Sequence, residues 1–214
     1  MKSKNNITDI NDAMRDVRKA FRLLYSYQCK IRDLMRFISA LVSRNCEYGY
    51  SRFSHSRSHK TATPLDYWIW DWLGMYFYEF KFEDTSIGND KYSFSIWLVS
   101  DTGFFDKEPQ GSKPKGKARL NLENYASTDE SATKLIFAAT KNASMDDFSD
   151  FYINQRKDSD AEYSRRIANK ILLCKSYDIS SFINEAETRK TVADFIAFCG
   201  KNGIKEITLA ELKD

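Results

Sequence analysis

The sequence predicts an α+β protein in which a long N-terminal helix and a C-terminal helix pack on one face of a mainly antiparallel β-sheet. Apolar residues at helical spacing run through the first 42 residues, alternating aromatic segments follow, and a capped helical segment comes near the end. Gly and Pro are scarce, at 8 and 3 of 214 residues, which is typical of long regular elements. We expect a single domain, because this length suits one hydrophobic core.

A helix of about 35 residues is predicted within residues 1–44, starting near Thr8 or Asp9 as its cap. Its apolar stripe advances by alternating steps of four and three residues, as in a coiled coil. The stripe consists of Ile10, Met14, Val17, Phe21, Leu24, Gln28, Ile31, Met35, Ile38 and Val42. After Phe21 the stripe widens, so we expect the second half to pack on the sheet and the first half to pair with another helix.

The centre of this stripe holds the expected contacts with a partner helix. These contacts are Leu24, Gln28 and Ile31. The polar Gln28 either sets the register of the pairing, as a single amide does in coiled coils, or lies partly exposed at a helix crossing. The partner is a second copy of this chain or another protein.

Positive charge is concentrated at the beginning of the chain. Residues 1–62 hold 13 Lys and Arg against 5 Asp and Glu, whereas residues 63–214 hold 20 against 25. Residues 45–62 lack periodicity and are rich in Ser and Arg, which predicts a basic loop. Rings among cations are suited to single-stranded nucleic acid, through base stacking and phosphate contacts. The candidate nucleic-acid-binding residues are Arg44, Tyr48, Tyr50, Arg52, Phe53, Arg57 and Lys60. This basic region could equally face an acidic protein surface.

A short helix is predicted over residues 64–73, at the start of a segment, 63–182, that also holds the sheet. Thr63 can cap this helix, Pro64 suits its first position and Gly74 its end, although alternating aromatic residues also fit one long strand. The helix carries Trp68, Trp70 and Trp72. Alternate residues of a helix point in different directions, so at least one of these tryptophans should lie outside the core and anchor a partner protein.

The strands are predicted from alternation of apolar and polar residues. Two clear strands cover residues 75–82 and 91–99, joined by a turn at 86–90, and the second should have one core face and one partly covered face. Further strands are predicted at 118–122, 132–140 and 167–177, of which the last two also fit helices.

The C-terminal helix is predicted over residues 183–200. Asn184 followed by Glu187 forms a capping box, and Gly200 suits the end of the helix.

One short motif suggests catalysis. Glu79-Phe80-Lys81 has the acid-x-Lys form of metal-dependent nucleases, in which the acid binds Mg²⁺ and the lysine polarises the phosphate or water. Asp71 would supply a second Mg²⁺ ligand. The alternative interpretation is an exposed ion pair on the solvated face of a strand, and the same pattern recurs at 211–213.

No other cofactor or metal site is expected. His55 and His59 are the only histidines, and no nearby cysteine pair or acid completes a zinc site. The four cysteines lack CxxC spacing, no apolar run is long enough to span a membrane, and we expect a cytoplasmic protein that does not bind membranes. The sequence therefore favours a non-enzymatic protein-interaction module, and the alternative is a nucleic-acid-binding protein or Mg²⁺-dependent nuclease.

Overall fold

The computed structural model describes residues 3–51, 75–103, 122, 125–145 and 162–210 of the chain. Its residues fall into two compact units, 1–37 and 38–214. The predicted short helix at 64–73 lies outside the described residues, as does the predicted strand at 118–122 except for its last residue.

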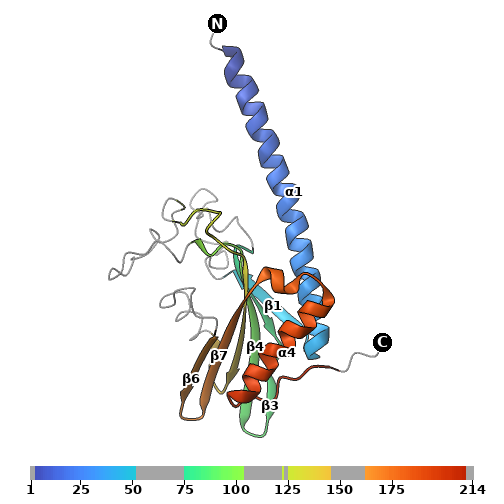
Figure 1. Ribbon diagram of the computed structural model, residues 1–214, viewed down its shortest axis with the longest axis vertical. Helices are drawn as coiled ribbons and strands as arrows, with labels where there is room; N and C mark the ends of the chain where they lie inside the picture. The colour runs from blue at the N-terminus through green and yellow to red at the C-terminus, as the bar shows by residue number, and fades with distance from the viewer. Residues whose placement is uncertain (1–2, 52–74, 104–121, 123–124, 146–161, 211–214) are drawn as a thin grey trace, which may run out of the picture. The chain divides into compact units, whose positions relative to one another are not determined.

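The N-terminal helix, α1, spans Ser3–Val42 (Figure 1). It begins several residues before the predicted cap at Thr8 or Asp9. The prediction of its start was wrong because residues 3–8 contain neither Gly nor Pro, so nothing local interrupts a helix that continues through them. Among the described residues, no helix has an apolar stretch long enough to cross a membrane.

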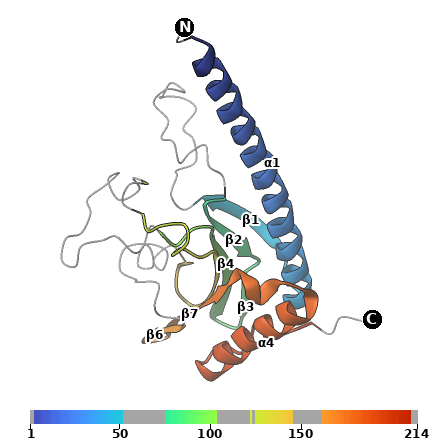
Figure 2. The same ribbon diagram turned by 45° about the horizontal axis from the view of Figure 1, so that its top comes forward.

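Within the described residues, seven strands form the sheet, and all of their pairings are antiparallel. The strands are β1 (Cys46–Ser51), β2 (Phe77–Phe82), β3 (Thr85–Ile87), β4 (Asp90–Val99), β5 (Lys134–Lys141), β6 (Glu162–Ile167) and β7 (Lys170–Asp178). Their order is β1-β2-β4-β5-β7-β6, and β3 pairs with β4 as a hairpin. Figure 2 shows β1, β2 and β4 side by side. The predicted antiparallel sheet of an α+β protein is confirmed.

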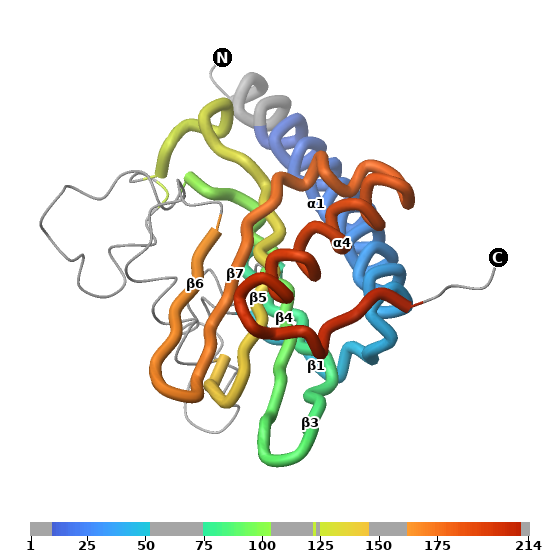
Figure 3. Tube along the Cα trace, turned by 60° about the horizontal axis from the view of Figure 1, so that its bottom comes forward, coloured from blue at the N-terminus to red at the C-terminus, as the bar shows by residue number. Residues whose placement is uncertain are grey.

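Three strands differ from the sequence prediction. β1 forms within the expected basic loop, because its backbone pairs with β2 rather than because its own sequence favours a strand. The expected strand at 167–177 is β7, preceded by a hairpin turn at Ala168, whose φ of 52° is left-handed, and by the unpredicted β6. β3 extends the predicted turn at 86–90 into a short hairpin that reverses at Gly88. Figure 3 traces both hairpins.

The sheet is buried on both faces at its centre. One face carries Phe94 and Phe137, whose rings lie 5.8 and 5.3 Å from that of Phe195 on the C-terminal helix. The opposite face carries a second cluster that includes Phe77 and Trp97. All residues of β4 from 92 to 99 are buried, so the expected partly covered face of this strand is a wrong prediction. The alternation of polar and apolar residues suggested a partly covered face, but the small polar side chains on that face of β4 are buried together with the large apolar ones.

The C-terminal helix, α4, spans Glu185–Lys201 and follows a short 3₁₀ helix, Ile179–Phe182. The side chain of Asn184 accepts a hydrogen bond of 2.9 Å from the backbone N–H of Glu187, as the capping prediction requires. The helix does not end at Gly200, which lies within it. Gly203 adopts the left-handed φ of 92° that commonly follows a helix end.

Candidate interaction surface

The first half of the α1 stripe is exposed. We define the N-terminal stripe as the large apolar side chains between residues 10 and 25 that share one side of the helix and are more than 40% exposed. It consists of Ile10, Met14, Val17, Phe21, Leu24 and Tyr25. Five of these lie on the predicted four-three spacing and Tyr25 flanks them, whereas Leu23, which is also exposed, points to the other side of the helix. The helix therefore presents to solvent a face whose composition is that of a helix-packing surface.

The same stripe is buried further along the helix. Ile31 and Met35 are each 3% exposed, whereas Leu24 is 44% exposed. Gln28 lies at the transition and is half-buried. Of the three expected partner contacts, only Leu24 is freely accessible on the described surface.

The charged residues beside the N-terminal stripe form ion pairs within the helix. Arg15 and Asp12 are joined at 2.6 Å, and Lys19 and Asp16 at 2.8 Å, both with i, i+3 spacing. Such exposed pairs contribute only about 0.3–0.5 kcal/mol each. These four charged residues lie on the side of the helix away from the apolar face.

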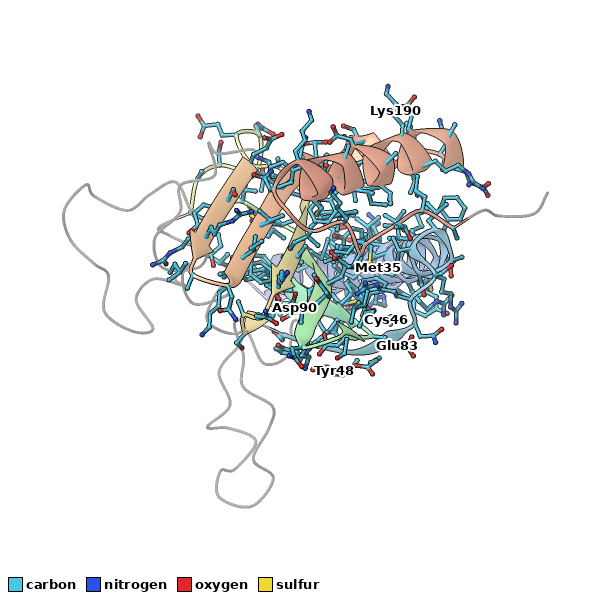
Figure 4. All side chains as sticks on the ribbon, turned by 90° about the horizontal axis from the view of Figure 1, so that it is seen from below. Met35, Cys46, Tyr48, Glu83, Asp90 and Lys190 are labelled. Atoms are coloured by element: carbon cyan, nitrogen blue, oxygen red, sulfur yellow. The ribbon has the colours of Figure 1, made fainter. Side chains whose placement is uncertain are left out.

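A second surface lies on β1 and β2. Tyr48 and Tyr50 stack at 6.0 Å between ring centroids, and the register places them opposite Lys81 and Glu79 of β2. The Lys81 ammonium lies 5.6 Å from the centre of the Tyr48 ring. We call Tyr48, Tyr50 and Lys81 the β1–β2 patch, and Glu79, opposite Tyr50, is buried. The structure thus brings together residues from two separate sequence hypotheses, nucleic-acid stacking and nuclease catalysis. Figure 4 shows Tyr48 at the edge of the sheet on the side away from α4.

The two members of the Glu79-Lys81 motif have different environments. Glu79 is fully buried, so the alternative interpretation of an exposed ion pair is wrong for this residue. Lys81 contacts Asp84 at 3.6 Å. Burial alone would lower the pKa of Lys81, but its hydrogen bond with Tyr48 and the charge of Asp84 raise it above its ordinary value. A lysine held in its charged form can bind an anion but is a poor proton acceptor.

The described residues contain no group of three His, Cys, Asp or Glu side chains that could hold a metal ion. Asp71, the expected second Mg²⁺ ligand, lies outside the described residues, as do His55 and His59. So do the remaining predicted contact residues, which are Arg52, Phe53, Arg57, Lys60, Trp68, Trp70 and Trp72.

Arg44 is buried and has a structural role. Its side chain is 7% exposed and donates hydrogen bonds to the backbone carbonyls of Glu83 and Glu206, at 3.3 and 3.0 Å. Burial lowers the pKa of this guanidinium, and the nearby charges of Asp84 and Glu206 oppose that effect. Arg44 therefore joins the start of β1 to the C-terminal segment, and its guanidinium is not presented to a nucleic acid.

A cluster that the sequence analysis did not identify joins β6, β7 and α4. Lys175 contacts both Glu162 and Asp194 at 2.7 Å, and it borders a surface cavity of about 330 Å³. Burial would lower the pKa of Lys175, but hydrogen bonds to the two carboxylates raise it above its ordinary value. The Lys175 ammonium is therefore unsuited to act as a nucleophile, and the cluster is best explained as a group of ion pairs that connects β6, β7 and α4. No sequence signal pointed to it, because three separate elements supply its members.

Comparison with known proteins identifies a matching family. A protein-family model, PM0109, matches residues 7–205. This range includes the N-terminal stripe, all seven described strands and α4. No curated protein and no solved structure matches the chain.

Proposed function

The chain belongs to the PM0109 family, and we propose that it is a non-enzymatic protein-interaction module whose N-terminal helix binds another helix through the N-terminal stripe. The observation that supports this proposal is the exposure of six large apolar side chains on one side of the helix between residues 10 and 25. A surface of this kind is unusual on a soluble chain unless something covers it. The Trp68–Trp72 segment is proposed as a second contact with the same partner.

The energetics of helix pairing are consistent with this role. Burying the exposed part of a Leu or Phe side chain contributes on the order of 1–2 kcal/mol. Several such contributions along one helix can offset the loss of translational and rotational freedom on association. The four residues of the ion pairs within the helix lie away from the apolar face, so none of these charges would have to be desolvated on pairing.

The test compares the wild-type protein with Leu24→Asp and with Ser26→Asp. Ser26 is exposed and lies on the opposite side of the helix from the stripe, so its variant controls for the added charge. Mass is measured by light scattering, and a partner chain is sought by co-purification. Any complex should be lost in Leu24→Asp and kept in Ser26→Asp. A complex that survives Leu24→Asp, or the absence of any complex, contradicts the proposal.

Nucleic-acid binding is the second candidate, and the β1–β2 patch favours it. Stacked rings beside a charged lysine suit an unpaired base and its phosphate. The probe is a fluorescent single-stranded oligonucleotide, measured between about 0.05 and 0.2 M salt, where phosphate contacts weaken steeply. Tyr48→Ala should weaken binding by about 1–3 kcal/mol and Tyr48→Phe should retain it. Binding that is independent of salt contradicts this candidate.

The nuclease form of this candidate has its own test. Cleavage should require Mg²⁺ and should disappear in Glu79→Gln, which keeps the size of the buried side chain. Circular dichroism of Glu79→Gln shows whether the fold is intact. Cleavage that persists without Mg²⁺ excludes the proposed chemistry.

We place the protein in the cytoplasm. All four cysteines are free thiols, and two of them, Cys174 and Cys199, are buried. Free thiols are stable in a reducing compartment.

A further inference from the structure

We propose that the N-terminal stripe is covered by a second copy of this chain, with the two helices parallel and in register. This inference rests on the proposed function and adds the identity and orientation of the partner. The spacing of the stripe is the first argument. A repeat of 3.5 residues keeps one face of a helix against another helix, whereas a single helix on a sheet needs no such regularity.

The area of the stripe is the second argument. Each of its six side chains is between 42% and 72% exposed. Each therefore offers on the order of 100 Å² to a partner. Two such helices together would bury up to about 1,200 Å², at the lower end of the range of about 1,200–2,000 Å² for stable protein interfaces. A second copy of the stripe thus supplies enough area without any other surface.

The residues that flank the stripe decide the orientation. In a parallel pair of helices, the residue just before a core residue such as Met14 or Phe21 faces the residue of the partner helix that lies five positions later in the sequence. Here Ala13 would face Arg18, and Ala20 would face Tyr25, so no like charges meet. An antiparallel pair that overlaps residues 10–28 would instead set the two copies of Arg18 against each other. Alanine at the flanking positions also lets the two backbones approach closely.

The test is disulfide formation between single cysteines at matched positions. The background carries Cys29→Ser and Cys46→Ser, which removes the two thiols that are not buried. Cys174 and Cys199 are kept, because they are buried and protected from reaction. Val17→Cys should form covalent dimers more than about tenfold faster than Lys19→Cys on the outer face, owing to its higher effective concentration. Lys19 has a side chain that is 69% exposed.

The possible outcomes separate this inference from the proposed function. Covalent Val17→Cys dimers support parallel pairing. A product formed only when Met14→Cys and Leu24→Cys proteins are mixed indicates antiparallel helices and overturns the inference. A wild-type protein that remains a monomer up to high concentration also overturns it, while a different helix could still occupy the stripe. A dimer that survives Leu24→Asp overturns the proposed function itself.

Discussion

The hydroxyl of Tyr177 on β7 donates a hydrogen bond of 2.6 Å to Oδ2 of Asp194 on α4. The same oxygen lies 2.7 Å from the ammonium of Lys175. Burial would raise the pKa of Asp194, but these two donors lower it below its ordinary value. Burial and the hydrogen bond to Asp194 both raise the pKa of Tyr177. One carboxylate therefore connects the helix to two residues of the strand.

This connection predicts a pH dependence. A carboxyl group whose pKa is lowered on folding stabilises the protein above its unfolded value of about 3.9, and this stabilisation is lost as the pH falls through the lower native pKa. Asp194→Asn should therefore reduce the free energy of unfolding by about 1 kcal/mol at neutral pH, discounted for the solvent exposure of the pair. The difference should shrink below about pH 4.

Urea unfolding at several pH values measures this effect. Tyr177→Phe, which removes one of the two donors and keeps Lys175, should show a smaller loss with the same pH trend. A difference between Asp194→Asn and wild type that stays constant down to low pH would argue against the ionic origin.

Gly49 on β1 has no room for a side chain. A Cβ there would lie 2.4 Å from the ring of Tyr78 and 2.9 Å from the backbone oxygen of Glu79. Gly49→Ala should therefore destabilise the protein by about 1–3 kcal/mol.

Gly200 provides the matched control, because it lies in a helix and a Cβ there would meet nothing within 4 Å. Gly200→Ala should stabilise the protein by about 0.5–1 kcal/mol. Chemical denaturation compares the two variants. Equal effects would mean that the pairing of β1 with β2 does not depend on close contact at Gly49.

Two positions of the apolar stripe of α1, one on either side of Gln28, should respond differently to the same substitution. Ile31 is 3% exposed and Leu24 is 44% exposed. Ile31→Asp buries a charge and should cost more than about 3 kcal/mol, whereas Leu24→Asp should leave the stability of the monomer within about 1 kcal/mol. Thermal unfolding under conditions where both proteins are monomeric makes the comparison. A similar loss in the two variants would show that residues 10–25 are buried within the monomer after all.

The N-cap of α4 offers a local test. Asn184→Ala removes the acceptor of the Glu187 N–H and should cost about 1 kcal/mol. Asn184→Ser keeps a suitable acceptor and should cost only a few tenths of that amount. Urea titrations of both variants resolve the difference, and a neutral Asn184→Ala would show that water replaces the cap without loss.

Elements marked by local signals were predicted well. The four-three spacing from Ile10 to Val42 indicated α1, and Asn184 with Glu187 indicated the start of α4. β2 and β4 followed from the alternation along their sequences, whereas the segment of β5 fitted a strand or a helix and was expected as a strand. β1 and β6 were missed, since they are edge strands whose conformation depends on the neighbour with which each pairs.

The candidate sites were harder to predict than the fold. The sequence analysis named Tyr48, Tyr50, Glu79 and Lys81, but it assigned them to different segments and different hypotheses. Only the pairing of β1 with β2 places them on one face. The Lys175 cluster could not be foreseen, because Glu162, Lys175 and Asp194 are separated in the chain and carry no recognisable spacing.

The sequence by itself determined the periodicity of the long helix, the alternation of the central strands and the cap of the last helix. These are local properties, since hydrogen bonds and side-chain directions within a few residues repeat with a fixed period. The tertiary structure alone decided that Glu79 is buried, that Ile31 is covered while Leu24 is exposed, and that Lys175 connects three elements. Burial and charge pairing depend on segments far apart in the chain, and a local pattern contains no information about which segment will cover it.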